Sequence, residues 1–106
     1  MDLNQELQAA ADQLDRARRK FARGENGLRL LSQSREAFIN SLRNTGLTYA
    51  DAKIKFDNCL DEQEAELLQL HEQMLYAERM HQYALHRIAL QHPSAQPDPT
   101  ESALAG

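Results

Sequence analysis

The chain has 106 residues, of which 42% are hydrophobic, 26% charged and 6% aromatic, with no tryptophan, four glycines and three prolines. This composition is typical of a single Leu- and Ala-rich helical unit; it excludes a collagen-like or largely disordered protein and disfavours a turn-rich β-sandwich. The net charge of −4 is unevenly divided, because residues 1–56 hold ten Lys and Arg against seven Asp and Glu, whereas residues 57–106 hold two against nine.

The first predicted helix covers about residues 3–44. Apolar side chains recur there at alternating intervals of four and three residues, the spacing of helices that pack along one stripe. Gly24 and Gly27 lie within this pattern, and each glycine costs a helix about 1 kcal/mol relative to alanine, so residues 24–27 are the expected place for a kink. The stripe consists of Leu3, Leu7, Ala10, Leu14, Ala17, Phe21, Leu28, Leu31, Arg35, Phe38 and Leu42.

A turn is expected at residues 45–48. Gly46 suits the left-handed backbone conformation that often follows a helix end. Thr48, followed three residues later by Asp51, resembles a capping box, in which side-chain oxygens accept hydrogen bonds from the free N–H groups of a helix start. A second helix with the same heptad spacing is therefore predicted over about residues 49–91.

Together these elements predict an all-α fold, a long antiparallel helical hairpin over residues 1–92. A connection of four residues makes the two helices neighbours, so the hairpin is expected to be a two-helix coiled coil. At 1.5 Å per residue each arm would span roughly 60 Å, which predicts a rod. Residues 93–106 are rich in proline and are expected to form a disordered tail.

The second helix is apolar over most of its circumference between residues 74 and 90. The alanine-rich stretch expected to face it is too narrow to cover such a surface. Two explanations are open: dimerisation into a four-helix bundle, or a docking face for a different protein. The side chains assigned to this contact are Met74, Tyr76, Met80 and Tyr83.

Two blocks of charge lie at different levels of the predicted hairpin. The acidic block is expected opposite residues 27–36, so the two blocks do not face each other within one chain. They are either solvated helix faces or contacts between chains that set register and partner choice. The basic block is Arg16, Arg18, Arg19, Lys20 and Arg23, and the acidic block is Asp57, Asp61, Glu62, Glu64 and Glu66.

Motifs of catalysis are sparse, and the sequence predicts a protein that is not an enzyme and has no cofactor. His71 begins a segment like HExxH, but Leu75 stands where the second histidine is needed. Glu78 and His81 form a Glu-x-x-His pair as in ferritin-like di-iron bundles, so a metal-binding dimer is one alternative function. A small DNA-binding regulator, using the basic residues 16–23, is the other.

Residues 28–69 carry a recognisable layout, which consists of Leu28 and Leu31, the segment Ser34 to Phe38, Leu42, the turn Gly46-Leu47-Thr48, and then Phe56, Leu60 and Gln63. This layout resembles the FliJ/YscO family, whose members are cytoplasmic stalk proteins of type III secretion and flagellar export. The resemblance implies a coiled-coil hairpin whose free ends insert into a hexameric export ATPase, and which contacts the export gate or escorts empty secretion chaperones. It also implies contact roles for Leu31, Phe38, Phe56 and Leu60.

No feature of the sequence directs the chain to a membrane or an oxidising compartment. Residues 1–6 lack the basic and then apolar pattern of a signal peptide, and no apolar stretch approaches the roughly 18 residues of a membrane span. Cys59 alone can form neither an intrachain disulfide nor a Cys-based zinc site. We therefore expect a cytoplasmic protein that acts by protein–protein contact, as a homodimer or as a subunit of a larger assembly.

Overall fold

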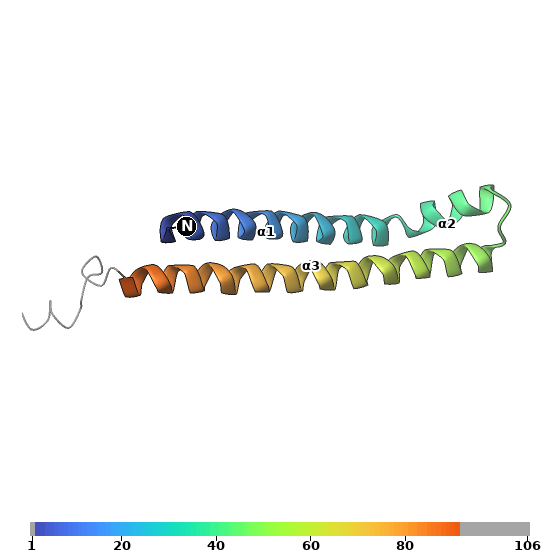
Figure 1. Cartoon of the computed structure of the whole chain (residues 1–106). Helices are drawn as coiled ribbons and strands as arrows, with labels where there is room; N and C mark the ends of the chain where they lie inside the picture. The colour runs from blue at the N-terminus through green and yellow to red at the C-terminus, as the bar shows by residue number, and fades with distance from the viewer. Residues whose placement is uncertain (1, 92–106) are drawn as a thin grey trace, which may run out of the picture.

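The computed structural model describes residues 2–91, and over this range helices are the only regular secondary structure, as predicted. Its helices are α1 (Leu3–Gln33), α2 (Arg35–Asn44) and α3 (Tyr49–Gln91). Figure 1 shows α3 running back beside α1 and α2, so that the molecule is a rod with extents of 78 × 33 × 14 Å. The predicted tail, residues 93–106, lies outside the described residues.

Helix α1 begins at a capping aspartate and continues without interruption through both glycines. The Asp2 carboxylate accepts a hydrogen bond from the Gln5 N–H at 2.8 Å, which satisfies one of the free donors of the first turn. A Cβ placed on Gly24 would lie 3.0 Å from the Cδ1 atoms of Leu67 and Leu70. Gly24 therefore allows close approach to α3, and residues 24–27 are not the place where the helix is interrupted.

The interruption lies instead at Ser34, between α1 and α2. The Ser34 N–H donates to two carbonyl oxygens, those of Leu30 at 3.0 Å and Leu31 at 3.2 Å, and the Ser34 side chain makes no capping hydrogen bond. Such a shared bond tightens the last turn of a helix, and serine favours helix ends over helix interiors. The predicted helix 3–44 is therefore two helices.

The turn between α2 and α3 is built by the residues that the sequence indicates. Gly46 has a φ of 107°, in the left-handed region that favours glycine. The Thr48 hydroxyl accepts a hydrogen bond from the Asp51 N–H at 3.2 Å, which is the hydroxyl half of the predicted capping box. The chain therefore reverses direction over a few residues, and α3 starts at Tyr49.

The best-packed part of the core lies beside this turn. Ile39, Ala52 and Phe56 are fully buried, and the Phe38 and Phe56 rings meet edge to face with centroids 5.4 Å apart. Ile39 lies outside the predicted stripe, next to its member Phe38, and is the buried residue of α2. The half-buried apolar side chains packed against this core are Leu31, Phe38, Leu42, Leu47 and Leu60.

The rest of the interface between α1 and α3 is narrower. Its buried residues are Leu14, Ala77 and Ala84, and small alanine side chains let the two helices approach closely. Two ion pairs join α1 to α3 on opposite edges of this interface. They join Arg87 Nη1 to Glu6 Oε2 at 2.8 Å, and Arg18 Nη2 to Glu78 Oε1 at 3.8 Å.

The two helical glycines give a matched pair of stability predictions. No atom lies within 4 Å of a Cβ added at Gly27, so Gly27→Ala is expected to raise the free energy of unfolding by about 0.5–1 kcal/mol through helix propensity. The same change at Gly24 gains propensity but presses on Leu67 and Leu70, and it should stabilise less. Urea unfolding followed by circular dichroism measures both variants, and a Gly27→Ala protein less stable than the parent would contradict this expectation.

Candidate interaction surface

A row of exposed apolar side chains runs along α3 beside the face that packs against α1. Tyr76, Met80 and Tyr83 are 53%, 40% and 57% exposed. Their intervals of four and three residues repeat the spacing of the buried positions, so they form a second heptad row on the same helix. We call the side of the rod on which Tyr76, Met80 and Tyr83 lie the aromatic face. A helix with two heptad rows can pack against a second neighbour as well as against α1.

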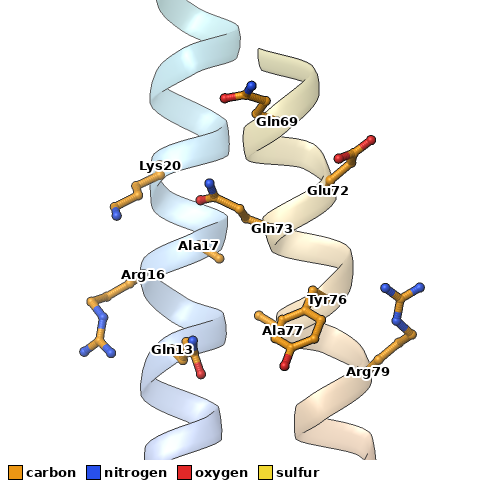
Figure 2. A pocket seen from close by; sticks show the side chains of 10 residues that line it. All are labelled: Gln13, Arg16, Ala17, Lys20, Gln69, Glu72, Gln73, Tyr76, Ala77 and Arg79. Carbon is orange, nitrogen blue, oxygen red and sulfur yellow. The ribbon is translucent and has the colours of Figure 1, made fainter. Parts of the chain in front are cut away.

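Both helices contribute to a groove on the aromatic face, shown in Figure 2, with a volume of about 640 Å³. Gln73 points from α3 toward α1, whereas Arg16 and Lys20 extend outward from α1. A second groove, with a volume of about 490 Å³, continues along the same face, because Lys20 and Gln73 line both. It adds Arg23 and Glu66 to the face, which is therefore apolar near the end of α3 and charged farther along the rod.

Tyr83 is held in place by the ion pair at the end of the rod. The guanidinium of Arg87 lies 5.8 Å from the centroid of the Tyr83 ring, close enough for a cation–π contact. The same guanidinium donates to Glu6 of α1 at 2.8 Å. A side chain fixed in this way loses less conformational entropy when a partner binds.

A second exposed apolar row lies on the opposite side of α3. Leu68, which is 67% exposed, and Leu75 are seven residues apart and share one helix position. Beside them, Phe21 and His71 stack with ring centroids 5.2 Å apart and line a mainly apolar groove of about 410 Å³. Leu68 is not among the predicted contact residues, although its spacing of seven residues from Leu75 is a signal that could have identified it.

The predicted contact residues fall into two separate groups. Leu31, Phe38 and Leu60 are half-buried around Phe56, which is only 1% exposed, so this group packs into the core beside the turn. Met74 is half-buried in the interface between α1 and α3, whereas Tyr76, Met80 and Tyr83 are exposed. The structure therefore brings the last three together on an open surface near the chain ends.

Of the pair in the metal-binding alternative, Glu78 is engaged in another contact. Glu78 forms the 3.8 Å ion pair with Arg18, and His81 is half-buried. Across the interface, Asp12 accepts a hydrogen bond from the Gln8 amide, and Asp15 pairs with Arg19 at 3.0 Å. Over residues 2–91, no group of three His, Cys, Asp or Glu side chains is placed to hold a metal ion.

The two charge blocks differ in how many of their members have a partner. In the basic block, Arg18 and Arg19 pair with carboxylates, whereas Arg16, Lys20 and Arg23 form no ion pair with any described residue. The acidic block, residues 57–66, is exposed at each acidic position and takes part in none of the described ion pairs. The structure thus leaves both signs of charge available on the aromatic face.

Comparisons with protein-family models, with curated proteins and with solved structures find no match to this chain. None of α1, α2 and α3 combines the length and the apolar character that a bilayer-spanning helix needs.

Proposed function

We propose that this protein is a non-enzymatic coiled-coil interaction protein that works in the cytoplasm and associates through its aromatic face. Each chain would be an antiparallel two-helix coiled-coil hairpin, and two chains would form a homodimer. The observation that carries this proposal is the second heptad row of α3, in which Tyr76, Met80 and Tyr83 remain 40–57% exposed although their spacing is that of a packed helix face.

The energetics of this row favour association. Burying a large apolar side chain contributes about 1.5–3 kcal/mol, and tyrosine is among the residues that most often dominate an interface. In a two-fold symmetric dimer every side chain of the face is buried twice, once in each copy. Because these side chains are already about half-buried within one chain, each contributes roughly half of that amount, so the row favours association and the rest of the face contributes to a stable dimer.

A pair of tyrosine variants tests the assignment of the face. Tyr83 and Tyr49 are both exposed on α3, and each has an arginine guanidinium 5.8 Å from its ring, Arg87 in one case and Arg43 in the other. Tyr83→Asp is expected to weaken self-association by about 30-fold or more, because a charge replaces a buried ring. Tyr49 does not share a heptad position with Tyr76, Met80 or Tyr83, so Tyr49→Asp should leave self-association unchanged.

Light scattering over a range of concentrations measures the mass of each variant, and circular dichroism checks that both remain helical. A dimer that persists in Tyr83→Asp and dissociates in Tyr49→Asp would place the interface on the helix side of Tyr49 and contradict the proposal.

We also propose a more specific role, as the cytoplasmic stalk of a type III export ATPase. The resemblance of residues 28–69 to the FliJ/YscO family supports it, together with a rod whose longest extent is 78 Å. Export ATPase components or secretion chaperones would then be the partners. A purified export ATPase hexamer should hydrolyse ATP faster when the full chain is added; an unchanged rate and no complex on sedimentation would count against the stalk role.

A further inference from the structure

The aromatic face carries apolar, basic and acidic side chains in a fixed order along the rod. The two grooves that share Lys20 and Gln73 place Tyr76, Arg23 and Glu66 on this one side. Intervals of seven residues extend the face on α3, from Gln73 to Met80 and from Glu66 to Cys59. From the end of α3 toward the turn, the order is Tyr83 and Met80, then Tyr76 at the same level as Arg16 of α1, then Lys20 and Arg23 of α1, and finally Glu66, Glu62 and Cys59.

The charged part of this order is unsatisfied within one chain. Arg16, Lys20, Arg23, Glu62 and Glu66 are exposed or line a groove, and none of them takes part in an ion pair between described residues. Apart from Glu72 and Arg79 of α3, which also line the first groove, cations and anions are thus grouped at neighbouring levels of the rod. A partner that fits must place anions at the level of these cations and cations at the level of these anions, which is the reverse order along the rod.

A second copy of the chain presents that reverse order in only one orientation. A two-fold axis along the rod would place the cations of one copy at the level of the cations of the other, and the anions at the level of the anions. Like charges set against each other in this way are unfavourable in an interface. A two-fold axis across the rod reverses one copy, so that the levels of Arg16 and Lys20 meet acidic levels, whereas Arg23, at the level of Leu70, lies beside the axis.

We propose that the occupant of the aromatic face is a second copy of this chain in antiparallel orientation, with the two-fold axis crossing α3 near Gln69 and Leu70. This inference deepens the homodimer proposed above and rests on it. Lys20 then reaches the level of the partner subunit's Glu66, and Arg16 the level of the partner subunit's Glu62. The apolar end of each copy meets the level of Leu30 and Cys59 in the other, and Leu30 is itself exposed.

The proposed axis sets a register that one natural residue reports. Cys59 and Met80 lie equally far from the axis on its two sides and share one heptad position, so Cys59 of one copy lies beside Met80 of the other. Within one chain the two residues belong to the same helix α3 and are separated by roughly 31 Å at 1.5 Å per residue. A disulfide between positions 59 and 80 can therefore form only between chains.

The test is the full chain carrying Met80→Cys, oxidised with oxidised glutathione, which is reduced as two thiols become one disulfide. Most of the protein is expected to run as a covalent dimer on a non-reducing gel, with peptide mapping showing a link between positions 59 and 80. The matched control is Leu85→Cys, near the same end of α3. Leu85 lies seven residues from Glu78 and therefore shares its side of α3. Glu78 pairs with Arg18 on the edge of the rod away from the aromatic face, so the Leu85→Cys variant should stay uncrosslinked.

A second variant separates the orientation from dimerisation itself. In Met80→Cys combined with Cys59→Ser, a link between two positions 80 would show a parallel dimer and overturn the antiparallel orientation, while the homodimer would stand. Equal crosslinking in the Leu85→Cys control would also overturn it, because the reaction would then be non-specific. A wild-type chain that is monomeric by light scattering would overturn both the orientation and the homodimer.

Discussion

Replacing Phe56 by alanine is expected to lower the free energy of unfolding by about 3–5 kcal/mol, the cost of a large cavity in a packed core. Phe56 is 1% exposed, and its ring contacts Phe38 edge to face and lies beneath the guanidinium of Arg35 at 5.8 Å. Removing the ring therefore takes away the contact that joins α2 to α3. Because small domains are stabilised by only about 5–15 kcal/mol in total, the loss is a large fraction of the stability.

Urea unfolding followed by circular dichroism measures this loss. The matched control is Ile54→Ala, two residues away on α3, where the side chain is exposed and the expected change is within about 0.5 kcal/mol. Equal losses in the two variants would show that Phe56 is not the centre of the core. They would also contradict the packing of α2 against α3.

The second large effect is expected at the other end of the rod. Leu14 is buried between α1 and α3, where its buried neighbours across the interface are alanines, so Leu14→Ala removes the main apolar side chain of that level. We expect a loss of about 2–3 kcal/mol, toward the lower end of the range for leucine, because the narrow interface allows water to reach the space that is left. Amide hydrogen exchange should become faster in α1 near Leu14 than beside the turn.

Leu68→Ala is the control for this prediction, because Leu68 is exposed and its truncation leaves no cavity. A Leu14→Ala protein as stable as the Leu68→Ala protein would contradict the interface described between α1 and α3. Exchange that becomes faster by the same factor at both ends would show that the rod unfolds as one unit.

Much of the fold follows from local rules that act on neighbouring residues. Heptad spacing predicts the helices, and the left-handed preference of glycine together with the Thr48 hydroxyl predicts the turn. The interruption at Ser34 is not predicted in this way, because it depends on a balance between a tight last turn and tertiary packing. Gly24 is also misjudged from local rules. Its cost to helix stability is a local property, whereas the close approach of Leu67 and Leu70 that it allows depends on the packing of α1 against α3.

The surface was predictable where spacing alone decides exposure. Tyr76, Met80 and Tyr83 are one helix row in the sequence and one exposed row in the structure. Phe56 is not predicted correctly in this way. The family resemblance implies a contact role for it, but an apolar residue in a contact surface and one in the core have the same spacing in the sequence, and Phe56 is in the core. The order of charges along the aromatic face also required the structure, since Lys20 and Glu66 belong to different helices and share a groove only once these pack together.

The most direct test of the account is the mass of the wild-type chain in solution, measured by sedimentation equilibrium from low to high micromolar concentration. The chain mass is 12.1 kDa, and association through the aromatic face predicts a species of about twice that mass, which dissociates on dilution. A mass of 12.1 kDa at every concentration would contradict the homodimer that the account proposes.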